Sequence, residues 1–172
     1  MARVAVLIEE LVEDAEFIYP FYRLQEAGYE VRVLAPRPGT YQGKHGGSYP
    51  AKYAADPEDA EGYDALFIPG GYAPDRLRRS EKVLELVRRI HDAGKPVAAV
   101  CHAPWVLISA GVVKGRNVTA FASIRDDLTN AGAIYTGRSA EFDGNLITAT
   151  DPSALPEMMR LFLKQLMKGS VQ

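Results

Sequence analysis

Short apolar runs alternate along the chain with longer segments in which apolar residues recur at helical spacing. Each short run is apolar on both faces, as a parallel strand must be when helices cover both sides of its sheet. These runs lie at residues 4–8, 31–35, 65–69 and 97–100. The alternation is typical of βαβ units, so it predicts an α/β fold with a doubly wound, mainly parallel sheet sandwiched by helices.

Three helical segments carry clear start or stop signals. Ser80 can cap a helix whose apolar stripe runs over 83–90 and which ends at Gly94. A last helix is predicted from Asp151 onwards, with its methionines filling the core. A shorter helix is predicted over 123–130.

Other stretches are less regular. Pro20 interrupts a segment of helical period at 13–27, so this helix either begins near Tyr19 or kinks at the proline. Glycines and alternating polar residues at 39–53 predict a hairpin or lid-like excursion outside the main sheet. The Asp-Gly-Asn sequence within 142–146 predicts a hairpin turn between two short strands.

Length, charge and cysteine content limit the class of protein. The 172 residues correspond to about one domain, so a single domain over 1–172 is expected. A formal net charge of -2 is too balanced to bind nucleic acid through a dominant basic face. The chain shows neither a signal peptide nor the ~20 apolar residues that span a bilayer, and its one cysteine cannot form an intrachain disulfide. These features favour a cytoplasmic protein with no membrane or nucleic-acid partner.

Cys101 comes directly after the buried run 97–100 and before an expected helix over 102–110. Open α/β sheets bind ligands at this carboxyl edge, and the small residues Ala99 and Ala103 permit the sharp turn of a nucleophile elbow. The amides and partial positive charge of the helix N-terminus are expected to lower the thiol pKa and favour the thiolate. The alternative is that Cys101 is simply a small buried hydrophobe.

The chain has three histidines, His45, His91 and His102, and none follows residue 102. His102 adjoins Cys101, but neighbouring helical positions point about 100° apart, so a structural role for His102 stays open. A glutamine amidotransferase is excluded, because its triad needs a later His-x-Glu pair. One cysteine and three scattered histidines also argue against a zinc site, so no metal and no cofactor are expected.

Further candidate groups reach the same sheet edge from two other strand ends. Gly70 and Gly71 follow the third apolar run and can supply amides for an oxyanion hole, or merely form a tight turn. Asp75 could orient a histidine, or be a solvated acid at a helix start. One carboxyl of the acidic cluster at 9–16 could point at the thiol and then have a raised pKa.

A series of ordered motifs covers nearly the whole chain, at residues 13–16, 18–20, 43–46, 64–71, 73–75, 94–97, 101–104 and 107–111. Together they resemble the PfpI family of the ThiJ/PfpI superfamily of stress proteins. The resemblance implies a flavodoxin-like sandwich with Cys101 on a strained nucleophile elbow. It also implies that Glu16, when protonated, hydrogen-bonds the Cys101 thiolate, and that Gly71 and the backbone around His102 form the oxyanion site.

The resemblance further implies that the Cys101–His102 pair is completed by an acid of a neighbouring subunit, at the position of Asp75. The protein is therefore expected to be a homodimer or a higher homo-oligomer with a shared active site. Asp75 stands where the family commonly has glutamate, so its carboxylate is one methylene further back.

Three other side chains are expected to shape the pocket. Ala103 stands where the family usually has glycine, which adds a methyl group at the elbow and is expected to narrow the pocket. Trp105 and Tyr72 are expected to line the pocket mouth and set its size, although each could equally be a local packing residue.

Three functions share this site, and the two enzymatic ones share a first step, attack of the Cys101 thiolate on a carbonyl carbon of a small carbonyl compound or a peptide. The leading hypothesis is a stress-response cysteine hydrolase of PfpI type, similar to an intracellular protease. The second is a glyoxalase or protein deglycase acting on methylglyoxal or its adducts, with Glu16 as proton shuttle. The third is a redox-sensing stress protein in which Cys101 is oxidised to a sulfinate.

Overall fold

The computed structural model describes residues 1–169, whose main sheet contains seven strands. The strands lie side by side in the order β10-β11-β7-β6-β1-β2-β5. Neighbouring strands run parallel except for the β10–β11 hairpin, which confirms the predicted mainly parallel sheet. In chain order the strands are β1 (Arg3–Leu7), β2 (Glu30–Ala35), β5 (Tyr53–Ala54), β6 (Ala65–Ile68), β7 (Val97–Val100), β10 (Ala140–Asp143) and β11 (Leu146–Ala149).

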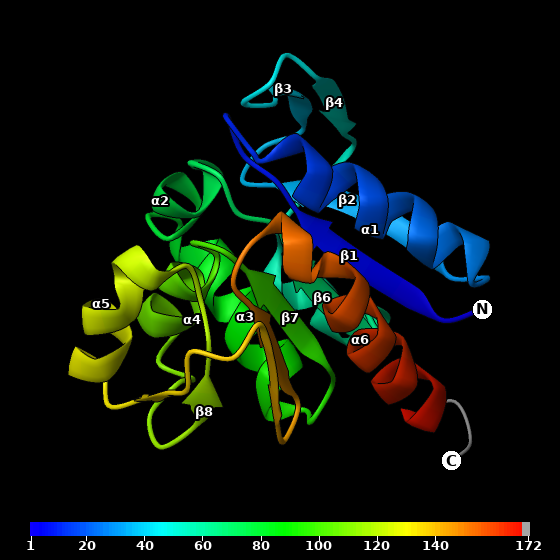
Figure 1. Ribbon diagram of the computed structural model, residues 1–172. Coiled ribbons are helices and arrows are strands. Elements are labelled where there is room, and N and C mark those ends of the chain that lie inside the picture. The colour runs from blue at the N-terminus through cyan, green and yellow to red at the C-terminus, as the bar shows by residue number, and fades with distance from the viewer. Residues whose placement is uncertain (170–172) are drawn as a thin grey trace.

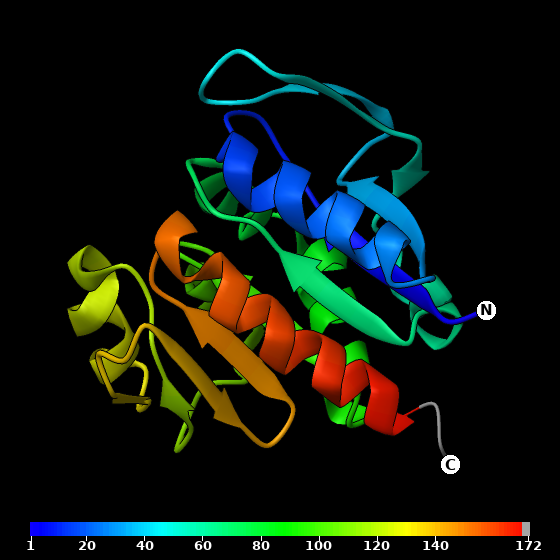
Figure 2. The ribbon, with the colours of Figure 1, turned by 45° about the vertical axis from the view of Figure 1, so that its right-hand side comes forward.

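Helices cover both faces of this sheet (Figure 1). On one face α1 (Asp14–Glu26) and α6 (Leu155–Gly169) lie side by side, as Figure 2 shows. On the other face α3 (Glu81–Asp92) packs beside α4 (Pro104–Ala110). The shorter helices α2 (Ala73–Leu77) and α5 (Arg125–Asn130) pack against α4.

The strands β1, β6, β7 and β11 are buried on both faces, so two apolar cores form. In β6, Leu66 and Ile68 point into the core under α3 and α4, whereas Phe67 points into the core under α1 and α6. The Phe67 ring meets that of Phe162 on α6, edge to face, with centroids 5.8 Å apart. All four predicted strands are therefore confirmed, because their continuous apolar runs match this two-sided burial.

Two of the predicted helices keep their boundaries. The Ser80 hydroxyl accepts a hydrogen bond from the Val83 amide at 3.3 Å and caps α3, as expected. Asp151 accepts from the Ser153 amide and begins a short 3-10 turn, η3 (Pro152–Ala154), which leads into α6. Met158 and Met159 are buried in the core beneath α6, as predicted.

Three helix boundaries differ from the predictions. Helix α1 begins at Asp14 and continues through Pro20, so the expected start near Tyr19 is wrong. A proline inside a helix costs roughly 3 kcal/mol, but the apolar stripe with Phe17 and Leu24 is buried against the sheet and offsets this cost. Helix α4 starts only at Pro104, and α5 is preceded by a separate 3-10 turn, η2 (Ala122–Ile124).

The remaining strands form hairpins and a small second sheet. Strands β3 (Gly39–Gln42) and β4 (Ser48–Ala51) pair antiparallel outside the main sheet, which confirms the predicted excursion. The predicted hairpin turn joins β10 to β11, with Gly144 at φ +62°, a conformation that favours glycine. A two-stranded sheet of β8 (Asn117–Val118) and β9 (Ile134–Tyr135) and the 3-10 helix η1 (Pro57–Gly62) complete the described fold.

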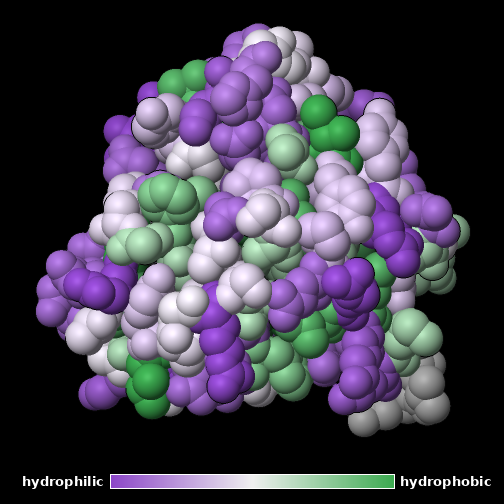
Figure 3. Space-filling view, in the orientation of Figure 1, coloured by the Kyte–Doolittle hydropathy of each residue, from purple (hydrophilic) through white to green (hydrophobic). Residues whose placement is uncertain are grey.

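The surface is mixed in character. The face seen in Figure 3 intersperses hydrophilic and hydrophobic residues, with the hydrophobic ones in small separate groups. None of the helices formed by residues 1–169 combines the length and the apolar character needed to cross a membrane.

Candidate active site

Cys101 sits at the sharp turn between β7 and α4, with a φ of +63°. This left-handed conformation is rare for a residue other than glycine, and such strain is held only where the surroundings enforce it. Here the Cys101 amide donates to the Ala149 carbonyl at 2.9 Å, and its carbonyl accepts from the Phe121 amide at 3.0 Å. A Cβ atom on Gly70 would lie 2.9 Å from the Cys101 Cβ, so only glycine fits beside the turn. The structure thus has the strained elbow that the sequence implied.

His102 lies directly against the thiol. Its Nδ1 is 3.2 Å from Cys101 Sγ, and its Nε2 is 3.1 Å from the Ser123 hydroxyl. The imidazole stacks on Phe121 and meets Trp105 edge to face, with centroid distances of 5.2 and 5.1 Å. Burial, assisted by the charge of Lys44, lowers the pKa of His102, so the ring is neutral at pH 7 and can accept the thiol proton.

Glu16 projects from the first turn of α1 into the same region and is fully buried. Its Oε1 accepts from the Gly70 amide at 2.8 Å, while Oε2 has no hydrogen-bond partner within the described residues. Burial, together with the nearby charges of Glu13 and Asp151, raises the pKa of Glu16 to about 8 despite the Gly70 hydrogen bond. Glu16 is therefore mainly protonated at neutral pH. The hydrogen bond to the Cys101 sulfur that the resemblance implied is not formed among the described residues, since Oε2 has no partner there.

The ionisation of the thiol differs from the expectation. Burial, followed by the negative charge of Glu16, raises the pKa of Cys101 to about 12, and hydrogen bonds from the Gly71 and His102 amides and the charge of Lys44 only partly oppose this. The expected net lowering of the thiol pKa is wrong, because burial and the charge of Glu16 outweigh the two amides. Helix α4 itself starts only at Pro104. When Glu16 is protonated, its negative charge no longer raises the pKa of Cys101. Two simultaneous negative charges on this buried pair are disfavoured. His102 Nδ1, which lies 3.2 Å from the sulfur, is placed to act as its base.

The two glycines have different roles. The Gly70 amide is occupied by Glu16, so it is not a free oxyanion donor. The Gly71 amide, by contrast, points at the Cys101 sulfur together with the His102 amide. Gly71 has a φ of +79°, and a Cβ there would lie 2.4 Å from the Glu13 nitrogen, so glycine is required. Gly71 and the His102 amide are therefore the available oxyanion donors.

These groups surround one cavity of about 360 Å³. Cys101, His102 and Glu16 lie in it together with Gly71, Tyr72 and Trp105, and the full lining is Glu13, Glu16, Lys44, Gly71, Tyr72, Cys101, His102, Trp105, Phe121, Asp151 and Pro152. Two expected side chains lie elsewhere. Ala103 is completely buried in the core under α3 and α4 and does not narrow the cavity. Asp75 is exposed on α2 and is not part of the cavity wall within this chain.

Sequence reasoning missed several residues of the cavity. Lys44 and Asp151 were available in the sequence, as a cation within the 43–46 motif and as a helix cap, but neither pattern indicated a position in the cavity wall. Phe121 and Ser123 follow the short strand β8 and carry no motif at all. The hydrogen bond from the Phe121 amide to the Cys101 carbonyl brings this segment to the elbow, together with the contacts of Phe121 and Ser123 with the His102 ring.

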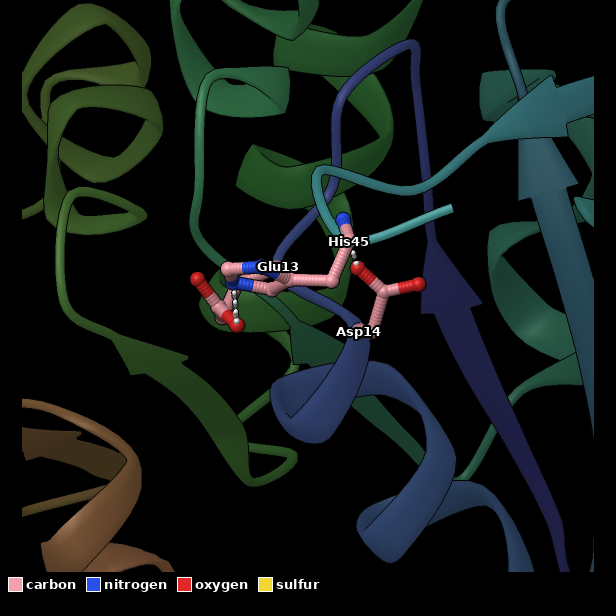
Figure 4. Close-up of side chains that lie close together, drawn as sticks. All are labelled: Glu13, Asp14 and His45. Carbon is pink, nitrogen blue, oxygen red and sulfur yellow. Dashed lines mark hydrogen bonds and ion pairs between the residues drawn. The ribbon is translucent and has the colours of Figure 1, made fainter. Parts of the chain in front are cut away.

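A neighbouring cluster of Glu13, Asp14 and His45 has potential metal-ligand atoms within 4.8 Å of one another (Figure 4). These atoms already have partners. Asp14 accepts hydrogen bonds from the His45 and Gly47 amides and from the Tyr49 hydroxyl. The Glu13 carboxylate contacts the His45 imidazole and the Lys44 ammonium at 3.0 and 3.2 Å. Because a cation already faces Glu13, we assign the cluster to anchoring the loop 43–47 rather than to metal binding.

The fold and the elbow define a flavodoxin-like sandwich with a cysteine at the carboxyl edge of its parallel sheet. The DJ-1/PfpI family model matches residues 2–165, and the chain belongs to this family.

Sequence similarity to two named proteins agrees with this family assignment. The chain is 45% identical to "Deglycase PfpI" of Pyrococcus furiosus over 154 residues, 90% of this chain and 93% of the relative. It is 38% identical to "Protein/nucleic acid deglycase 2" of Escherichia coli over 167 residues, 95% of this chain and 97% of the relative.

A solved structure shows the same fold. A two-domain protein of Anabaena variabilis, with DJ-1/ThiJ/PfpI-like and ferritin-like domains, superposes with a TM-score of 0.94 at 42% identity. The match covers 96% of this chain and 48% of that protein, so this chain spans about half of its length.

Proposed function

We propose that the protein is a cysteine-dependent hydrolase of small carbonyl adducts, that is, a deglycase. The observation that carries the proposal is the cavity itself: the Cys101 sulfur lies 3.2 Å from a neutral His102, beside a mainly protonated Glu16. This combination supplies a nucleophile, a base and a second proton-transfer group in one cavity. The names of the two relatives above, both deglycases, support the same reaction class.

In the first step, His102 Nδ1 takes the thiol proton as the sulfur attacks the carbinol carbon of an amine adduct of methylglyoxal. A carbon–sulfur bond forms, the carbon–nitrogen bond breaks, and the amine leaves with the proton from His102. The product is a hemithioacetal on Cys101. The Gly71 and His102 amides can donate to the oxygen of this intermediate.

In the second step, the carboxylate form of Glu16 takes the proton from the carbinol carbon while the adjacent carbonyl oxygen gains a proton, which gives an enediol. Glu16 then returns its proton to the former carbonyl carbon as the original hydroxyl group loses its own, so one hydrogen moves between the two carbons and one between the two oxygens. A pKa near 8 suits this role, because both protonation states are accessible near neutral pH. The result is a thioester of lactate, which one water molecule hydrolyses to lactate and the free thiol. Overall, the adduct and one water give the amine and lactate.

The size of the cavity favours a small acyl or carbonyl group over a long peptide. A volume of about 360 Å³ is near the lower end for ligand pockets. A three-carbon adduct on one amine fits this space, whereas an extended peptide would place most of its residues outside it.

The proposal is tested by measuring lactate and free amine released from a methylglyoxal adduct of N-acetyl-lysine. We expect Cys101→Ala to lower release to the uncatalysed rate, and we expect His91→Gln, a histidine change remote from the cavity, to leave it within about twofold. Release by Cys101→Ala at the wild-type rate would contradict the proposal.

Peptide hydrolysis is a second candidate, because the same sulfur–imidazole contact is the minimal unit of a cysteine peptidase. The two reactions differ in their dependence on Glu16. Deglycation predicts that Glu16→Ala is at least as damaging as His102→Ala, because only Glu16 serves the second proton transfer. Peptidase chemistry predicts the reverse order with a fluorogenic peptide, and comparison of both variants on both substrates separates the candidates.

A further inference from the structure

We propose that Ser123 is a positioning residue that holds His102 in the orientation and tautomer in which Nδ1 accepts the Cys101 thiol proton. The inference rests on the proposed function, and it places the residue that orients His102 within the same chain. Its basis is the contact of each imidazole nitrogen with one partner: Nδ1 with Cys101 Sγ at 3.2 Å, and Nε2 with Ser123 Oγ at 3.1 Å.

A neutral imidazole has one N–H donor and one bare nitrogen acceptor. For Nδ1 to accept the thiol proton, Nε2 must carry the hydrogen and needs an acceptor, a role that the Ser123 oxygen at 3.1 Å can fill. After the transfer both nitrogens carry hydrogen, and Nε2 still donates to Ser123 while Nδ1 faces the thiolate. The same atomic positions therefore serve both protonation states, with no rearrangement during the reaction.

The position of Ser123 is itself fixed relative to the elbow. Ser123 lies in the 3-10 turn η2, whose Ile124 is 1% exposed in the core. Two residues earlier along the chain, the Phe121 amide donates to the Cys101 carbonyl at 3.0 Å. The position of Ser123 is thus fixed by the burial of Ile124 in the core and by the backbone hydrogen bond from Phe121 to Cys101.

Aromatic contacts restrict the imidazole further. Phe121 stacks on the His102 ring with an interplanar angle of 27°, and Trp105 meets it at 66°. Trp105 is in turn held by its Nε1, which donates to Asp127 at 2.9 Å. These rings hold the plane of the imidazole, but a 180° flip within that plane would exchange its nitrogens and carbons. The Ser123 hydrogen bond opposes that flip.

This assignment competes with the expectation that Asp75 of a neighbouring subunit orients His102. Both groups would bind the same Nε2 of the imidazole, and within this chain the Ser123 oxygen already lies 3.1 Å from it. The two arrangements therefore make opposite predictions for changes at positions 123 and 75.

The experiment compares Ser123→Thr with Ser123→Val, two side chains of nearly the same shape of which only threonine keeps a hydroxyl. We expect Ser123→Val and Ser123→Ala to lower kcat for lactate release about tenfold with KM within about twofold, the loss of one hydrogen bond in the reacting state. Ser123→Thr should keep kcat within about threefold of wild type. Ser109→Ala is the control. It removes the hydroxyl of a serine on α4 that accepts a hydrogen bond from Arg78 at 2.9 Å, and it should leave kcat within about twofold of wild type.

Two readouts need no turnover and so test Ser123 even if the proposed function fails. The rate of Cys101 alkylation by iodoacetamide at pH 7 should fall about tenfold in Ser123→Val and recover in Ser123→Thr. The ¹⁵N spectrum of His102, assigned with His102→Gln, should shift away from the Nε2–H tautomer in Ser123→Val only. An unchanged spectrum and alkylation rate in Ser123→Val would overturn the inference, as would a loss of kcat in Asp75→Asn that exceeds the loss in Ser123→Val.

Discussion

Two buried carboxyls stand two residues apart on the first turn of α1, and their ionisation is opposite. Asp14 is 8% exposed and Glu16 is fully buried. Burial acts to raise the pKa of Asp14, but hydrogen bonds from the Tyr49 hydroxyl and the His45 and Gly47 amides lower it overall. Glu16 has the Gly70 amide as its one described donor, and its pKa rises to about 8.

Two differences separate the pKa values of the acids: Glu16 is the more deeply buried, and Asp14 has three donors from other residues where Glu16 has one. The loop at 43–47 closes over Asp14 and gives it a structural anion site. Glu16 instead faces the cavity of Cys101, where its Oε2 has no partner among the described residues. One turn of helix therefore carries both a fold-stabilising carboxylate and a carboxylic acid available for proton transfer.

The largest expected effect is on the pH dependence of stability. The folded-state pKa of Glu16 is raised from 4.5 to about 8, so its contribution to stability is present below pH 4.5 and is lost as pH rises through about 8. Glu16→Gln cannot ionise, so its free energy of unfolding relative to wild type should increase by on the order of 5 kcal/mol between pH 4 and pH 9. Urea unfolding at several pH values measures this, and a constant difference would contradict the raised pKa.

The next effect is on catalysis. Glu16→Gln keeps the size of the side chain and can still accept from the Gly70 amide, but it cannot transfer a proton. We expect kcat for lactate release to fall about 10²- to 10³-fold, within the range for loss of general acid–base catalysis. Asp14→Asn, the matched change at the other carboxyl, should lower kcat less than tenfold. Equal losses in the two variants would mean that the acids do not differ in role.

Asp14→Asn should instead lower the free energy of unfolding by about 2 kcal/mol at pH 7, because its charged acceptor serves three donors. The folded-state pKa of Asp14 lies below 3.8, so this stabilisation is present above pH 4 and is lost as the pH falls through the folded-state pKa. The gap between wild type and Asp14→Asn should thus close in acid, opposite to the behaviour at Glu16. Chemical unfolding of wild type and Asp14→Asn at pH 3 and pH 7 measures whether this gap closes.

The smallest effect is expected at Tyr49. Tyr49→Phe removes one of the three donors to Asp14 and should cost about 1 kcal/mol of stability, while the two backbone donors remain. Tyr22, 62% exposed on α1, gives the control, since Tyr22→Phe should change the midpoint of thermal unfolding by less than about 1 °C. A cost at Tyr49 no greater than at Tyr22 would show that the hydroxyl does not hold the loop.

Much of the fold was predictable, because local patterns and burial agree there. The four strand runs are apolar at every position except Arg32, and a sheet covered on both faces buries such runs. Pro20 was the exception, since the local penalty of a proline gave no information on the core that α1 covers. The elbow was predictable from its position between a strand and a helix, with small neighbours.

The candidate site was predictable in part. Cys101, His102 and Glu16 were named from the sequence, and they share one cavity. The direction of the thiol pKa was not predictable, because it depends on how deeply the sulfur is buried and on a carboxyl 85 positions earlier in the chain. The same reason explains why Gly70 was expected among the oxyanion donors and instead holds Glu16.

The sequence by itself determined which runs form the buried strands, where the chain must turn sharply, and that Cys101 stands at that turn. The tertiary structure decided the protonation and the partners of the groups around it. It brings Ser123 to the far nitrogen of His102 and closes a loop over Asp14 but not over Glu16. Periodicity and turn chemistry act between near neighbours in sequence, whereas burial and hydrogen-bond supply are properties of the space that distant segments enclose.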